Sequence, residues 1–129
     1  MFDHLGIIVT DADKAFKFYS AALSPLELRV IQHQPNGAFI IAGSGDEFLY
    51  VGPEAPEFWS DAHRPSLSPI HICLSAPSRA AVDEFHAAAL ANGGHDNGKP
   101  GERDPGYYAA YALDPDGNNI EAAHRESNF

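Results

Sequence analysis

Apolar and polar residues alternate along the start of the chain in the pattern of a half-buried β-strand. In the stretch from residue 2 to residue 9, Leu5, Ile7 and Val9 lie on one face of such a strand. The same alternation places His4 on the opposite face. A strand is therefore expected here, with a histidine on the side away from most of the apolar residues.

The periodicity then changes to that of a helix. Thr10 and Asp11 are capping residues, and apolar side chains recur at helical spacing until Pro25 ends the pattern. Stretches in which apolar and polar residues alternate follow, together with turn signals such as Pro35-Asn36-Gly37. Three more strands are expected, at about residues 26–34, 38–42 and 47–51. Residues 1–51 thus form a first β-α-β-β-β module.

The second half repeats this order after a proline-rich linker at residues 52–69. Residues 70–74 predict a strand, Ser78 caps a helix, and Asn92-Gly93-Gly94 ends it. Residues 95–107 are rich in Gly, Pro, Asp and Asn, which predicts a short strand and a long loop. Two strands are expected at about residues 107–113 and 118–123, joined by the turn Asp114-Pro115-Asp116-Gly117. Residues 70–129 thus form a second β-α-β-β-β module.

Residue offsets support an internal repeat. His4 and His71 are separated by 67 positions (71 − 4), as are the similar helical segments that begin at Phe18 and Phe85 (85 − 18). The turn at residues 43–46 aligns with the turn at residues 114–117 at an offset of 71. This offset makes Tyr50 the counterpart of Glu121 (121 − 50). Repeated units of this kind bury their open faces against each other. The sequence therefore predicts one α+β domain over residues 1–129.

Composition narrows the functional class. The chain has 129 residues, 44% of them hydrophobic, and a formal charge of −10, without a basic stripe, so nucleic-acid binding is not expected. No apolar run is long enough to cross a membrane, and no signal peptide is evident. A single cysteine fits a reducing compartment. A cytoplasmic protein is expected.

The repeat brings a metal-binding donor set into one predicted cleft. Alternation and the offsets place His4, His71, Tyr50 and Glu121 at equivalent positions of the two modules. A carboxylate in an apolar strand is costly to bury unless it is hydrogen-bonded or bound to a metal. Two imidazoles and a carboxylate are ligands of Zn²⁺ or non-haem Fe²⁺, with Mn²⁺ and Ni²⁺ as alternatives. A single strand histidine is more often structural, and the shared offset of the two histidines favours a metal site.

Several motifs together resemble the vicinal oxygen chelate superfamily, which includes glyoxalase I, fosfomycin-resistance thiol transferases, extradiol dioxygenases and bleomycin-resistance proteins. The motifs are residues 2–5 (FDHL), 18–23 (FYSAAL), 69–72 (PIHI) and 114–121 (DPDGNNIE). The resemblance implies two βαβββ modules paired into a cupped, half-open barrel. It also implies a divalent metal held by His4, His71 and Glu121, a small substrate with vicinal oxygens, and a homodimer.

The chain departs from this family at Tyr50, because glyoxalase I has a metal-binding glutamate at the matching position. Ordinary glyoxalase I chemistry is therefore disfavoured, and a lyase or isomerase of another kind, a thiol transferase or a dioxygenase is expected. Tyr50 is a candidate for substrate contact or proton donation, with core packing as the alternative. Tyr107, Tyr111 and Trp59 are candidate substrate contacts, with packing or solvation as the alternative.

Two further expectations follow. Cys73 shares a strand face with His71 and is expected to be a buried, inert thiol. The competing function is a metal-free small-molecule binder of the bleomycin-resistance type. Those proteins lack the ligand set of two histidines and a glutamate, which favours the metalloenzyme.

Overall fold

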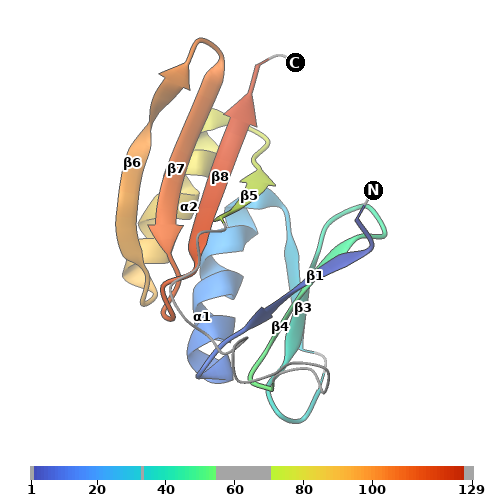
Figure 1. Cartoon of the computed structure of the whole chain (residues 1–129). Helices are drawn as coiled ribbons and strands as arrows, with labels where there is room; N and C mark the ends of the chain where they lie inside the picture. The colour runs from blue at the N-terminus through green and yellow to red at the C-terminus, as the bar shows by residue number, and fades with distance from the viewer. Residues whose placement is uncertain (1, 33, 55–70, 127–129) are drawn as a thin grey trace.

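Two four-stranded sheets, each with one long helix packed against it, make up the part of the chain that the computed structural model describes (Figure 1). The described residues are 2–32, 34–54 and 71–126. Most of the predicted linker, with Trp59, lies outside them. The elements are β1 (His4–Ile8), α1 (Ala12–Leu23), the 3-10 helix η1 (Ser24–Leu26), β2 (Arg29–Gln32), β3 (Phe39–Ala42), β4 (Phe48–Gly52), β5 (His71–Ser75), α2 (Arg79–Ala91), β6 (His95–Asp104), β7 (Tyr107–Leu113) and β8 (Asn119–Arg125).

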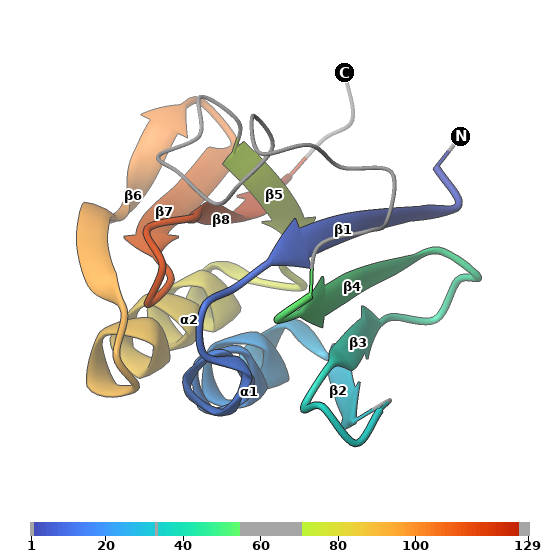
Figure 2. The same ribbon diagram turned by 60° about the horizontal axis from the view of Figure 1, so that its bottom comes forward.

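The two sheets have the same topology. Their strand orders are β1-β4-β3-β2 and β5-β8-β7-β6. In each sheet the first strand pairs in parallel with the last one, and the remaining pairs are antiparallel. The sheets do not close into a barrel, and both helices lie on one side of the strands (Figure 2). The predicted α+β fold of two βαβββ modules in a cupped, half-open arrangement is confirmed.

Both long helices begin where the sequence predicts a cap. The side chain of Asp11 accepts a hydrogen bond from the Lys14 amide at 3.1 Å, and that of Ser78 accepts one from the Ala81 amide at 3.1 Å. These bonds satisfy amides that have no partner within the helix. Helix α1 ends at Leu23, before Pro25 as predicted, and the short helix η1, which was not predicted, begins at Ser24.

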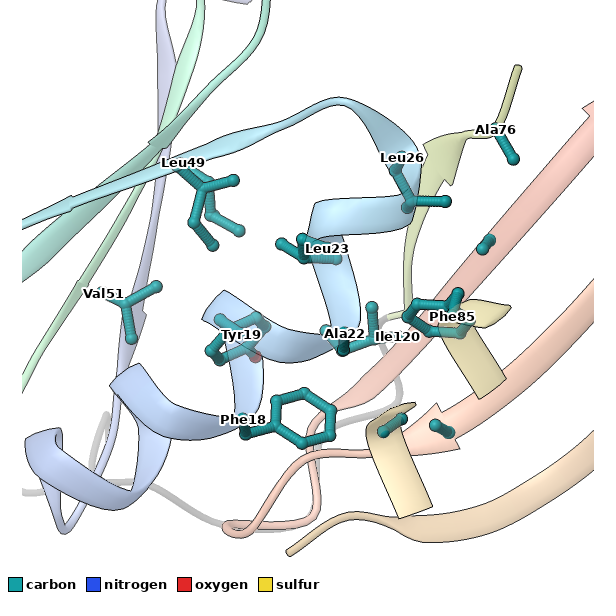
Figure 3. Close-up of a cluster of buried hydrophobic side chains, with 14 of the residues drawn as sticks. Phe18, Tyr19, Ala22, Leu23, Leu26, Leu49, Val51, Ala76, Phe85 and Ile120 are labelled. Atoms are coloured by element: carbon teal, nitrogen blue, oxygen red, sulfur yellow. The ribbon is translucent and has the colours of Figure 1, made fainter. Parts of the chain in front are cut away.

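The apolar faces of the helices meet in one core that both modules share. Phe18 and Leu23 of α1 and Phe85 of α2 are fully buried in a single cluster with Ile120 of β8 (Figure 3). Burial of each such side chain contributes about 1.5–3 kcal/mol. The two modules therefore stabilise each other through their helix layer.

Hydrogen bonds from the β7–β8 turn also join the modules. The hydroxyl of Tyr19 in α1 donates to Asp114 Oδ2 at 2.8 Å, and both side chains are fully buried. Asp116 Oδ1 accepts from the amide and the hydroxyl of Thr10 at 3.1 and 2.6 Å. Gly117 completes the turn with φ of +87°. The predicted turn is confirmed, and it also contacts the first module.

Strand β6 is longer than predicted. It spans ten residues, His95–Asp104, where the sequence predicts a short strand and a long loop. The register shifts three times along its pairing with β7. These irregularities allow glycine and proline to occur in a strand, because a bulge leaves some backbone groups out of the hydrogen bonds between the strands.

Within the described residues, no helix is long and apolar enough to cross a membrane.

Candidate metal and substrate site

Strand register places the predicted site residues at equivalent points of the two sheets. Gly6 pairs with Tyr50 in the first sheet, and Cys73 pairs with Glu121 in the second. These two pairs are related by the offsets of 67 (73 − 6) and 71 (121 − 50). The predicted equivalence of Tyr50 and Glu121 is therefore confirmed at the level of the strand pairing.

Glu121 is a buried carboxylate with a partner at each oxygen. It is 3% exposed, and its Oε2 atom lies 3.4 Å from Nε2 of His71. Its Oε1 atom accepts a hydrogen bond from the Tyr107 hydroxyl. Burial and this bond raise the pKa of Tyr107 above its ordinary value, since each disfavours the phenolate. The structure thus brings together three residues that the sequence singled out.

Cys73 differs from its prediction in one respect. The residue is exposed rather than buried, at the edge strand β5. Loss of hydration at the sulfur raises the pKa of the thiol to about 12, and the neighbouring Glu121 carboxylate adds to this effect. The sequence predicted burial because it could not show that β5 would be a sheet edge. The prediction of an inert thiol agrees with the raised pKa.

His4 is exposed, as is His71, whereas Glu121 is buried. The Nδ1 atom of His4 lies 2.6 Å from Oδ1 of Asp3, and its ring stacks on Phe48 with centroids 5.0 Å apart. The hydrogen bond to Asp3 leaves Nε2 as the ring nitrogen available to a ligand. His4 is held at the start of β1, on the same face as Tyr50.

The edge strands β1 and β5 of the two sheets lie next to each other (Figure 2). Residues of both strands line a cavity of about 810 Å³. His4 lines it from the first module, and His71 and Cys73 line it from the second. Its apolar walls include Leu5, Leu26, Leu28, Ile41 and Leu49 of the first module and Ile72 and Leu74 of the second. Both predicted histidine ligands therefore border one space.

The described residues contain no group of three His, Cys, Asp or Glu side chains placed to hold a metal ion. His71 and Glu121 lie together, whereas His4 borders the shared cavity without joining them in such a group. Imidazole nitrogen and carboxylate oxygen are nonetheless donor types that divalent metals use. The donor types therefore fit a metal in their chemistry.

Aromatic and cationic side chains lie on the face of the second sheet that carries Glu121. Tyr111 pairs directly with Glu121, and Tyr107 pairs with Arg125, four residues further along β8. The Arg125 Cζ atom lies 4.0 Å from the centroid of the Tyr107 ring, and the Arg103 Cζ atom lies 5.1 Å from that of Tyr111. Both tyrosines are half-buried. The predicted placement of Tyr107 and Tyr111 on one face is confirmed.

Comparison with known protein families gives a direct result. The model of the Glyoxalase/Bleomycin resistance protein/Dioxygenase superfamily matches residues 1–122. The chain belongs to this superfamily.

Solved structures of the superfamily have the same fold. A glyoxalase/bleomycin resistance protein from Albidiferax ferrireducens T118 is 30% identical, with a TM-score of 0.77 over 97% of this chain and 98% of that one. A glyoxalase/bleomycin resistance protein/dioxygenase family enzyme from Burkholderia phytofirmans PsJN is 17% identical, with a TM-score of 0.71 over 94% and 95% of the two chains. A lactoylglutathione lyase from Agrobacterium tumefaciens is 21% identical, with a TM-score of 0.66 over 95% and 93%. No curated protein matches the chain.

Sequence reasoning missed two features of this superfamily member. The Tyr107 hydroxyl contacts Glu121 across β7 and β8, although the two residues are not directly paired. Asp114 is fully buried and accepts four hydrogen bonds, from Tyr19, from the amides of Asp116 and Asn118, and from the Asn118 side chain. The turn motif could have indicated the local bonds, but no local signal identifies Tyr19 as a partner 95 residues away.

Proposed function

We propose that the protein is a divalent-metal-dependent enzyme acting on a small substrate with two adjacent oxygen atoms. The observation that carries this proposal is the 3.4 Å approach of His71 Nε2 to the buried Glu121 carboxylate, with His71 itself lining the cavity. Removing a carboxylate from water is costly, and a metal ion is one of the few partners that offsets this cost.

In this proposal His4, His71 and Glu121 hold the metal. Asp3 would orient the His4 ring through Nδ1, as acceptors beside metal-binding histidines commonly do. When bound, a divalent metal supplies Lewis-acid activation of the substrate oxygens. Zn, Fe, Mn and Ni are the candidate metals.

The other residues of the site would bind and orient the substrate. The Tyr107 hydroxyl holds the Glu121 carboxylate by donating to Oε1. Tyr107 and Tyr111 would contact substrate from the face that carries Glu121. Trp59 stays a candidate contact that lies outside the described residues.

Tyr50 limits the reaction class. Because it stands at the counterpart of Glu121, that strand position offers no carboxylate to serve as a base. We therefore disfavour ordinary glyoxalase I chemistry, and propose a glyoxalase-like lyase or isomerase, a thiol transferase or a dioxygenase. Tyr50 would act as a substrate contact or proton donor, and Glu121 as the catalytic carboxylate that binds the metal.

One observation favours a second candidate function. Both Glu121 oxygens already have partners, Tyr107 and His71, so the carboxylate does not require a metal to be satisfied. A metal-free protein that binds or sequesters a small molecule in the cavity is the alternative. A homodimer likewise stays a prediction from the family resemblance.

Metal analysis separates the two functions. Protein purified without chelator should hold about one divalent metal per chain, and His71→Ala should hold almost none. His95→Ala is the matched control, because His95 is an exposed histidine on β6 of the same sheet; this variant should keep its metal. A negligible metal content in the wild type, or full retention in His71→Ala, would overturn the metalloenzyme. Ligand-induced thermal stabilisation that is unchanged in EDTA would then support the binder.

A further inference from the structure

Arg103 is held by backbone carbonyls and by a tyrosine ring. Its Nη2 atom donates to the carbonyl oxygens of Lys99 and of Ala109, the latter at 3.3 Å, and its guanidinium stacks on Tyr111. In the described part of the chain, no carboxylate oxygen lies within ion-pairing distance of Arg103. This is notable in a chain with 18 acidic residues and 8 basic ones.

Arg79 provides the contrast within the same sheet. Its Cζ atom also lies 5.1 Å from a tyrosine ring centroid, that of Tyr108. It forms ion pairs with Glu102 and Glu126, at 3.3 and 2.7 Å. Tyr108 donates to Asp83 of α2, so this arginine and tyrosine lie on the helix side of the sheet. The arginine stacked on tyrosine on the helix side is thus neutralised, whereas Arg103 on the other side has no carboxylate partner among the described residues.

The position of Arg103 relates it to the candidate site. Tyr111, on which it stacks, pairs directly with Glu121 of β8 and with Gly98 of β6. Strands β6 and β8 are two strand spacings apart, roughly 10 Å. A ligand that contacts Glu121 could therefore extend across Tyr111 and reach the guanidinium with a group at its far end.

We propose that Arg103, held against Tyr111, binds an anionic group of the substrate, so that the substrate class is a small acid with vicinal oxygens. The inference rests on the proposed function for the position of those oxygens. Guanidinium recognises carboxylate or phosphate through paired, charge-assisted hydrogen bonds. Because two carbonyls and a ring already hold the side chain, little conformational freedom is lost on binding.

The test compares catechol with 3,4-dihydroxybenzoate, which has the same vicinal oxygens and an added carboxylate. Affinities are measured by calorimetry on Zn²⁺-loaded protein, because Zn²⁺ does not undergo redox reactions. The acid should bind wild type roughly tenfold or more tightly than catechol, the gain typical of a charge-assisted hydrogen bond. Arg103→Gln should bring the two affinities within about twofold of each other, and Arg103→Lys should retain part of the preference. Arg79→Gln is the matched control and should keep the full preference.

The outcomes distinguish this inference from the proposed function. If the protein binds Zn²⁺ but Arg103→Gln keeps the wild-type preference, the anion site is wrong and the metal site stands. If the wild type binds no Zn²⁺, the proposed function fails, and 3,4-dihydroxybenzoate is titrated into wild type and Arg103→Gln in EDTA. Weaker binding to the variant then supports the anion site, whereas equal or absent binding overturns it. Thermal unfolding of each variant verifies that it is folded.

Discussion

At the scale of single residues, the Glu121 carboxylate alters the chemistry of Cys73. The two residues pair across β5 and β8, and the pKa of the thiol is raised from 9.0 to about 12 by lost hydration and by Glu121. A raised thiol pKa keeps the neutral form to higher pH. The reactive thiolate is therefore scarce at ordinary pH, although the residue is exposed.

We therefore expect slow alkylation of Cys73 in metal-free protein kept in EDTA. At pH 8.5 its thiolate fraction should be far below that of an ordinary cysteine. Iodoacetamide should therefore react roughly tenfold or more slowly, because the greater nucleophilicity of a more basic thiolate offsets only part of the difference. The rate should rise with pH beyond pH 10. Glu121→Gln removes a negative charge from beside the sulfur and should speed the reaction at pH 8.5.

Mass spectrometry of the alkylated chain provides the measurement. Protein unfolded in urea is the control, and its cysteine should react at the rate of a free thiol. Rapid alkylation of folded wild type at pH 8.5, equal to that in urea, would contradict the raised pKa. An unchanged rate in Glu121→Gln would show that Glu121 is not one of its causes.

At the scale of secondary structure, the elements that depend on residues close in the sequence could be predicted, and the element that depends on distant residues could not. Helices α1 and α2 were predicted with their caps, because a cap and an apolar stripe are encoded within about four turns of chain. Strand β6 was not, because its glycine-rich sequence adopts a strand only through pairing with β7. Local composition alone indicates a loop there.

The pairing of β6 with β7 brings the backbone of Gly98 close to the Tyr111 ring. A Cβ atom at this position would lie 2.6 Å from Cδ2 of Tyr111, whereas one at Gly101 would meet nothing closer than the Lys99 carbonyl oxygen at 4.0 Å. Gly98→Ala must displace the Tyr111 ring and should lower the free energy of unfolding by about 1–3 kcal/mol. Gly101→Ala is the matched control on the same strand.

Urea denaturation followed by circular dichroism measures both variants. The Gly101→Ala variant should remain within about 0.5–1 kcal/mol of wild type. Equal stabilities of the two alanine variants would show that the close approach of Tyr111 to β6 does not limit this strand.

At the scale of the whole molecule, the repeat predicted the arrangement of the modules but not all of their contacts. The offsets of His4 to His71 and of Tyr50 to Glu121 predicted equivalent positions in the two modules, and the strand pairings agree with them, because both modules have the same topology. They could not reveal contacts that break the symmetry. One such contact is the bond from Tyr19 to Asp114, which joins helix α1 to the turn of the other module.

Loss of that bond should weaken the association of the modules and so the whole fold. Tyr19→Phe leaves the buried Asp114 carboxylate without one donor, at an expected loss of about 1.5–3 kcal/mol in the free energy of unfolding. Tyr108→Phe is the matched control, since its hydroxyl donates to the exposed Asp83 at 2.6 Å, and water replaces the lost partner there. Its loss should stay below about 1 kcal/mol.

Both variants are compared with wild type by urea denaturation, with one fluorescence probe and one circular dichroism probe. Because the core is continuous across the modules, Tyr19→Phe should still unfold in one transition at a lower urea midpoint. Two separate transitions would show that this bond, rather than the apolar core, couples the modules. Equal midpoints for Tyr19→Phe and Tyr108→Phe would mean that the buried bond between the modules contributes no more to stability than an exposed one.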